Sequence, residues 1–538
     1  MPRRSREDDD EPNRSRRDFL GASAGALAAL GAPSTSAAAA VAMKPFAFEE
    51  ATLADLGSRM ASGELTATAL ASAYLDRIRE IDQAGPALRA VIEVNPDALA
   101  IAQSLDRERK AGRVRGPLHG IPVLVKDNIA SGDKMSTSAG SLALDGVRCA
   151  HDAPVVARLR EAGAVLLGKT NLSEWANFRS SNSLSGWSSR GGQTLNPYAY
   201  ERSPSGSSSG SGAAVAANLC AAAIGTETDG SITSPSACNS LVGLKPTLGF
   251  VSRTGIVPIA HSQDTAGPMA RSVADCALLM NAIAGADPLD GATLEKGMPR
   301  DFDFARHLGR TDLKGVRLGV GRQYFGANEK ADRLIEAALA ALKDLGAELV
   351  DVEIPSFGKV DDAEFEVLLF EFKADLGRFF ARHMPEGPLK SLADVIEFNA
   401  RNAGRTMPIF GQDLLVKAQE KGPLTDRKYL AALAKCRKLS RAEGIDAALG
   451  KHRVQAIVAL TSPPPWIRDP VNGDSSRGGC TTFPAVAGYP HVTVPAGYVA
   501  GLPVGVSFFG ARWSDAQLLG LAHAYEQATR HRRAPQLA

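Results

Sequence analysis

The chain has 538 residues, and its 61 Lys and Arg against 59 Asp and Glu leave a formal net charge of +2. This balance gives no general electrostatic footprint for DNA, RNA or an anionic membrane, so we expect no nucleic-acid partner. Hydrophobic residues at 44% and charged residues at 22% are typical of globular proteins and exclude extended disorder over most of the chain. The six cysteines form no C-x-x-C pair and the nine histidines no H-x-x-x-H pair. We therefore expect no metal and no cofactor, and cysteine spacing alone assigns no disulfide.

Residues 1–42 resemble a twin-arginine export signal. Arg16 and Arg17 stand directly before a small-residue apolar run over residues 19–32. That run of 14 residues is shorter than the roughly 20 that span a bilayer, and the alanines of residues 37–42 offer A-x-A cleavage sites. The alternatives are a disordered basic tail or an uncleaved anchor. Cleavage predicts a periplasmic or secreted bacterial protein with no stable membrane insertion after processing.

From Phe46 onward, short apolar runs alternate with stretches of helical periodicity. Helices are predicted around residues 70–81 and over residues 331–345 and 515–529, and strands at residues 121–125, 164–167, 316–320, 349–354, 456–460, 491–495 and 504–509. Strands interleaved with helices indicate an α/β protein with a largely buried sheet. Residues from about 355 to 450 are richer in charge and helix signal. We interpret them as a helical insertion that shapes a substrate cleft within one domain over residues 43–538.

Two motif matches are poor physical fits. Residues 163–170, Gly-Ala-Val-Leu-Leu-Gly-Lys-Thr, satisfy the phosphate-loop pattern, but their apolar centre favours a buried strand over a loop that cradles phosphate. Residues 206–210 satisfy the nucleophile-elbow pattern of α/β-hydrolases, which needs an apolar strand directly before it. The preceding residues 201–205 are polar and include Pro204. A triad completed by a later histidine such as His491 is therefore only the second choice for this loop.

Two hydroxyl-rich segments are better candidates for a site. The Ser/Gly-rich residues 203–212 lead into an alanine-rich stretch, residues 213–223, that is helical in character. A flexible linker is the alternative, yet linkers are seldom flanked by buried-looking helix and strand. Small side chains and unpaired N–H groups at a helix N-terminus suit a ligand. A second hydroxyl-rich turn follows at residues 226–235.

Three segments in order resemble the amidase signature family, whose members hydrolyse carboxamides with a Ser-Ser-Lys triad. Residues 120–128, Gly-Ile-Pro-Val-Leu-Val-Lys-Asp-Asn, match the segment that holds the family's lysine, and residues 206–211 match its G-S-S-G-G-S loop. Residues 229–231, Asp-Gly-Ser, match the turn that presents the nucleophile. The resemblance covers essentially everything after the export signal. It implies an α/β fold with a large mixed β-sheet covered by helices on both faces.

The resemblance also implies the role of each site residue. Ser231 attacks the amide, Ser207 relays the proton, and neutral Lys126 is the terminal base, with burial lowering the lysine pKa. Sequence alone could not choose Lys126 over Lys169 or Lys245. The peptide bond between residues 206 and 207 is expected to be cis. The backbone N–H groups that form the oxyanion hole would be those of Thr228, Asp229, Gly230 and Ser231.

Several positions depart from the commonest family pattern: Ser209, Asp229 and Thr233 replace two glycines and an arginine. With Trp187, these variants resemble the bacterial peptide amidases, which remove the C-terminal amide of peptides and release ammonia. The alternatives are an acylamidase or esterase of the same fold, or a non-catalytic amidase-like binding protein. Aromatic residues in the Gly/Ser/Pro-rich loops either line a cleft or pack loops onto the core: Trp175, Phe178, Trp187 and Trp466. Whether the enzyme is a monomer or a homo-oligomer stays open.

Overall fold

The computed structural model describes residues 45–476 and 478–537, so the export signal predicted at residues 1–42 lies outside the described residues. The strands are β1 (Val91–Val94), β2 (Pro122–Lys126), β3 (Val165–Thr170), β4 (Trp187–Ser188), β5 (Gly192–Gln193), β6 (Ala222–Glu227), β7 (Val242–Lys245), β8 (Thr265–Ala270), β9 (Arg317–Val320), β10 (Glu348–Asp351), β11 (Ala456–Leu460), β12 (His491–Val499) and β13 (Leu502–Gly510).

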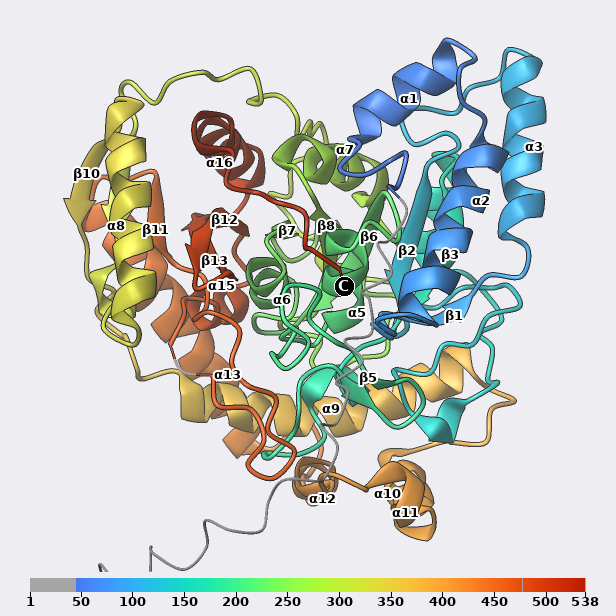
Figure 1. Cartoon of the computed structure of the whole chain (residues 1–538). Helices are drawn as coiled ribbons and strands as arrows, with labels where there is room; N and C mark the ends of the chain where they lie inside the picture. Colours follow the sequence, from blue (N-terminus) through green and yellow to red (C-terminus); the bar gives the residue numbers. More distant parts are fainter. Residues whose placement is uncertain (1–44, 477, 538) are drawn as a thin grey trace, which may run out of the picture. The chain divides into compact units, whose positions relative to one another are not determined.

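The α-helices of the described chain surround these strands (Figure 1). They are α1 (Leu53–Ala61), α2 (Ala67–Arg77), α3 (Ala98–Lys110), α4 (Pro154–Glu161), α5 (Ser209–Ala216), α6 (Thr233–Cys238), α7 (Val273–Ile283), α8 (Glu329–Asp344), α9 (Asp361–His383), α10 (Leu392–Arg401), α11 (Ala403–Thr406), α12 (Asp413–Gln419), α13 (Arg427–Arg437), α14 (Asp446–His452), α15 (Thr482–Ala487) and α16 (Asp515–Thr529). None of the helices in this part of the chain combines the length and apolarity that a membrane span requires.

One mixed sheet of 11 strands forms the core, in the order β1-β3-β2-β6-β8-β7-β12-β13-β11-β9-β10. The strands β3, β2 and β6 are parallel, as are β11, β9 and β10, while the strands between these groups pair antiparallel. The steps from β2 to β3 and from β3 to β6 cross the sheet in opposite directions, so right-handed crossovers place α4 and α5 on opposite faces. The α4 face continues through α7 and α16, and the α5 face through α6. The predicted α/β fold with helices on both faces is confirmed.

All seven apolar runs predicted as strands form strands, with ends that differ by a few residues. The predicted helix over residues 213–223 is wrong in part, because α5 ends at Ala216 and β6 already begins at Ala222. The small residues of β6 read as helix formers in isolation, but they are buried between β2 and β8, which both pair with them. Tertiary pairing overrides local propensity here.

Between β10 and β11 the described chain is helical, from α9 to α14, and contains no strand. Aromatic side chains fix this helical segment to the loops before α5. Trp187 on β4 packs edge-to-face on Phe410, with ring centroids 5.0 Å apart, and Phe178 packs on Phe372 of α9 at 5.3 Å. Trp175 is buried as well. For these three aromatics, burial supports the packing of loops onto the core, whereas Trp466 is half-buried and donates Nε1 to Asp474 at 2.9 Å.

Candidate active site

Lys126 is the last residue of β2, a strand paired on both sides by β3 and β6. Its side chain is fully buried, and Nζ lies 2.7 Å from Oγ of Ser207. Nζ also donates to Oγ1 of Thr226 at 2.9 Å and to the carbonyl of Thr226 at 3.3 Å. The structure therefore joins Lys126 and Ser207, which are 81 residues apart in sequence, in one hydrogen bond.

Burial lowers the pKa of Lys126 to about 7, although the negative charges of Asp264 and Glu227 oppose the shift. Desolvation disfavours the ammonium form because the low-dielectric surroundings solvate charge poorly. A large fraction of the amine is then neutral near pH 7, where an ordinary lysine is almost fully protonated. Lys126 thus has the protonation state that a general base needs.

Ser207 lies two residues before α5 and is almost fully buried. The peptide bond between Gly206 and Ser207 is cis, as expected. The carbonyl of Ser207 accepts a hydrogen bond from the backbone N–H of Ser173. A Cβ atom on Gly206 would lie 2.3 Å from Oγ of Ser173, so only glycine fits at this approach.

Ser231 lies in the turn between β6 and α6. A buried carboxylate shapes this turn: Oε2 of Glu227 accepts from the N–H groups of Ile232 and Thr233 at 2.8 and 2.9 Å. Gly230 has φ +73°, a conformation that favours glycine. The carbonyl of Ser231 accepts from the N–H of Ser208 at 3.1 Å, which places the turn directly beside the Ser207 segment.

The backbone N–H groups predicted to form the oxyanion hole, those of residues 228–231, have no hydrogen-bond acceptor among the described residues, 45–476 and 478–537. Thr228 and Ser231 are each 7% exposed, so these donors lie in a largely dry environment. Unpaired donors there are available to a developing oxyanion. Oδ2 of Asp229 accepts from Oγ1 of Thr482 at 2.8 Å, which fixes its side chain against α15.

The other lysines considered from the sequence lie elsewhere. Nζ of Lys169 donates to the carbonyl of Ile129 and to Oγ1 of Thr137, and Nζ of Lys245 donates to the carbonyl of Pro246. Each is buried, so position at a strand end could not separate them from Lys126. Among the described residues, only Lys126 contacts Ser207, and this contact distinguishes it from the other two lysines.

The structure also excludes the two motif matches. Residues 165–170 form the buried strand β3, not a phosphate loop. Ser208, the serine of the elbow pattern, is buried and donates to the carbonyl of Thr226 at 3.0 Å. Nε2 of His491 is hydrogen-bonded to Ser507, 2.5 Å away. The second-choice triad is therefore wrong, because Ser208 and His491 belong to separate buried hydrogen-bond networks.

Four polar residues of the site were missed from the sequence. Thr226 accepts from both Lys126 and Asn128, Glu227 shapes the nucleophile turn, and Asp264 accepts from Oγ1 of Thr228 at 2.5 Å. Thr226, Asn128 and Glu227 each lie within five residues of a predicted site residue. That proximity was the available signal. Asp264 had no such signal, because pairing of β8 with β6 brings it to the site.

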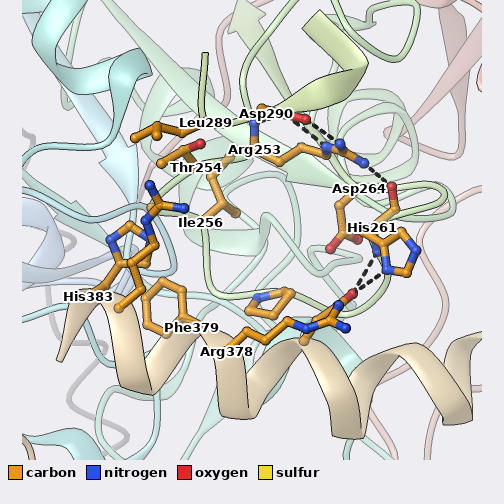
Figure 2. A pocket seen from close by; sticks show the side chains of 14 residues that line it. Arg253, Thr254, Ile256, His261, Asp264, Leu289, Asp290, Arg378, Phe379 and His383 are labelled. Atoms are coloured by element: carbon orange, nitrogen blue, oxygen red, sulfur yellow. Dashed lines mark hydrogen bonds and ion pairs between the residues drawn. The ribbon is translucent and has the colours of Figure 1, made fainter. Parts of the chain in front are cut away.

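Asp264 also lines a pocket of about 220 Å³ (Figure 2). Its hydrogen bond to Thr228 places this pocket beside the turn of residues 228–231, which we call the oxyanion turn. Phe379 and Arg378 of α9 form the opposite wall of the pocket. Burial raises the pKa of Asp264 to about 6, while its hydrogen bonds to Thr228 and to the N–H groups of residues 259 and 260 lower it. Asp264 thus fixes the pocket wall to the first residue of the turn.

His261, Glu371 and Asp375 are close enough together to hold a metal ion. Their ligand atoms already have protein partners: Nδ1 of His261 lies 2.7 Å from Asp375, and Glu371 accepts from Tyr429 and from the N–H of Ser262. The carboxylate oxygens therefore already accept hydrogen bonds from protein donors, and a cation would have to displace these donors. The expectation that no metal takes part stays a prediction.

Comparisons with known proteins agree on one family. The profile of the amidase family matches residues 69–519. A probable amidase of Arabidopsis thaliana is 41% identical over 501 residues, covering 91% of this chain and 92% of that protein. A glutamyl-tRNA(Gln) amidotransferase component of Pseudomonas syringae pv. syringae is 37% identical, covering 90% and 99%. The X-ray structure of native peptide amidase from Stenotrophomonas maltophilia is 52% identical, covers 92% of this chain and 100% of that one, and has a TM-score of 0.86.

Proposed function

The chain belongs to the amidase family and is an amide-hydrolysing enzyme, and we propose that it removes the C-terminal amide of peptides through Lys126, Ser207 and Ser231. The observation that carries the mechanism is the distance of 2.7 Å between Nζ of Lys126 and Oγ of Ser207 in a fully buried setting. The similarity to a peptide amidase over almost the whole chain supports the substrate class.

In this mechanism Oγ of Ser231 attacks the carboxamide carbon while its proton passes to Ser207, whose own proton passes to neutral Lys126. The C=O bond opens to an oxyanion, which the N–H groups of residues 228–231 stabilise. The protonated lysine then returns a proton through Ser207 to the leaving nitrogen, the C–N bond breaks, and ammonia departs. Water hydrolyses the acyl-enzyme by the same steps and yields the peptide carboxylate.

Ammonia release from a panel of amidated peptides tests this proposal. We expect Ser231→Ala to abolish release and Lys126→Met, which keeps the bulk of the side chain, to reduce it severely, with both variants folded by circular dichroism. A chelator should not inhibit the wild type. Full activity of folded Ser231→Ala would contradict the mechanism. Hydrolysis of an anilide or an ester in preference to every peptide amide would contradict the proposed substrate class.

We also propose that residues 1–42 direct export of the folded enzyme. Arg16 and Arg17 before a short apolar run support this proposal. The six cysteines lie in the described chain, buried and unpaired, so folding before export would need no disulfide formation. Replacement of both arginines by lysine should move activity from the periplasmic to the cytoplasmic fraction of a bacterial host. Unchanged fractionation would contradict the proposal.

A further inference from the structure

A second cavity, of about 350 Å³, lies beside the oxyanion turn and is lined by guanidinium groups. We call it the arginine pocket and define it by Arg437, Arg441, Arg512, Glu295 and Gln263. Nε2 of Gln263 donates to the carbonyl of Thr228 at 3.2 Å, so one side chain forms both the pocket wall and a contact to the oxyanion turn. The pocket is therefore next to the reaction centre.

The arginine pocket has more positive than negative charge. Glu295 pairs with both terminal nitrogens of Arg512. Arg441 donates Nε to the carbonyl of Ala487 at 2.9 Å. Across residues 45–476 and 478–537, neither Arg437 nor Arg441 has a carboxylate within ion-pair distance. Arg437, Arg441 and Arg512 thus face the single carboxylate of Glu295, while a fourth arginine of the lining, Arg253, is paired with Asp290.

These positive charges repel one another. Burial lowers the pKa of the Arg441 guanidinium, and the charges of Arg512 and Arg437 lower it further, while Tyr489 and Glu295 oppose the shift. An anion in the pocket would relieve this repulsion and would accept hydrogen bonds from the terminal nitrogens of Arg441. The planar fork of a guanidinium matches a carboxylate in particular, because two parallel N–H donors meet its two oxygens.

The rest of the lining limits the kind of anion. Leu248, Leu433 and Val486 add apolar surface next to the guanidinium groups. A cavity of this volume exceeds the roughly 30 Å³ that one water occupies in the liquid by about tenfold. The pocket therefore suits a carboxylate attached to a small apolar body better than a small inorganic ion.

We propose that the arginine pocket is a binding site for a carboxylate-bearing organic ligand. The carboxylate could belong to an acidic side chain of the amide substrate or to a free organic acid, and the two sources make different predictions. The first source rests on the proposed peptide-amide function, whereas the second does not.

Titration calorimetry at low salt tests the free acid. We expect 4-methylpentanoate to bind the wild type and 4-methylpentan-1-ol, its uncharged analogue, not to bind. Arg437→Gln, at an exposed position, and Arg441→Gln should each weaken binding by about tenfold or more, since a hydrogen bond to a charged group contributes that much. Lys435→Gln removes the same charge from α13 outside the pocket and should bind like the wild type.

Steady-state kinetics test the substrate source. Glu in place of Gln at one of the last three positions of an amidated peptide should raise kcat/KM in the wild type. In Arg441→Gln, the ratio of kcat/KM for the Glu peptide to kcat/KM for the Gln peptide should fall to about one. An arginine-dependent carboxylate effect in either experiment supports the site and identifies its source. Arg437→Gln and Arg441→Gln variants that match the wild type in both would overturn it. If no peptide amide is hydrolysed, the proposed function is contradicted, but the calorimetry still tests whether the arginine pocket binds a carboxylate.

Discussion

Replacement of Thr226 by Val should shift the pH dependence of the enzyme. Protonated Lys126 has three N–H donors, and its three partners are Oγ of Ser207, Oγ1 of Thr226 and the carbonyl of Thr226. All three can accept a hydrogen bond, so they stabilise the ammonium form against the burial that lowers its pKa. Valine has nearly the same shape as threonine and removes one of these acceptors.

The size of the shift follows from that single contact. A hydrogen bond to a charged group contributes about 1.5–3 kcal/mol, and one pKa unit corresponds to about 1.4 kcal/mol. Loss of Oγ1 should therefore lower the pKa of Lys126 by about one to two units, from about 7 to roughly 5–6. Because the base acts when deprotonated, kcat/KM rises with pH through this pKa, and the midpoint of the rise should move to lower pH by the same amount.

The assay is kcat/KM for one amidated peptide between pH 4 and pH 9, with the melting temperature measured at each pH. Thr226→Ser keeps the hydroxyl and is the matched control, so its midpoint should stay near that of the wild type. The valine variant should also melt at a lower temperature, because Nδ2 of Asn128 loses its acceptor at 3.0 Å. A midpoint that stays in place or moves to higher pH in Thr226→Val would refute the reasoning.

Two further substitutions test the turn and the packing around the site. Gly230→Ala should lower kcat/KM by about tenfold, because φ +73° costs other residues about 1–2 kcal/mol and the new Cβ would lie 3.0 Å from Oγ1 of Thr481. Adding Thr481→Ala relieves the contact but not the dihedral, so complete recovery would speak against backbone strain. Trp187→Ala should lower the free energy of unfolding by about 3–5 kcal/mol, since it deletes the ring packed on Phe410. Val471→Ala, at a position that is 78% exposed, should leave the melting temperature unchanged, and equal losses in the two variants would contradict the role of packing.

The sequence predicts β2, β3 and the five strands from β12 to β10, but it misses the central strands β6, β8 and β7 and the edge strand β1. Strands rich in large apolar residues, such as β11 and β13, are recognisable because few polar residues interrupt them. The central strand β6 consists of Ala, Gly, Thr and Glu around a single Ile, and β8 includes a proline. Such residues form strands only because neighbours on both sides pair with them, and a local pattern contains no information about those neighbours.

The residues of the candidate site also fall into a group that the sequence predicts and a group that it misses. Lys126, Ser207 and the turn at Ser231 follow from motifs with fixed spacing, and the structure brings their segments together. Thr226 belongs to the unrecognised strand β6, and Asp264 directly precedes the unrecognised strand β8. Both reach the site through strand pairing. Residues that tune the base were therefore missed for the same reason as the strands that hold them.

The location of Lys126 on a strand that is paired on both sides has a consequence for inactivation by heat. The distance between the amine and Ser207 depends on β2 staying paired with β3 and β6, and on the buried Ser207 segment, which is hydrogen-bonded to Ser173 and to the turn at Ser231. Local opening of the peripheral helices would leave that distance intact, whereas separation of the strands would destroy it. Irreversible loss of turnover during heating should then follow the kinetics of global unfolding, with no earlier phase in which a folded but inactive enzyme accumulates.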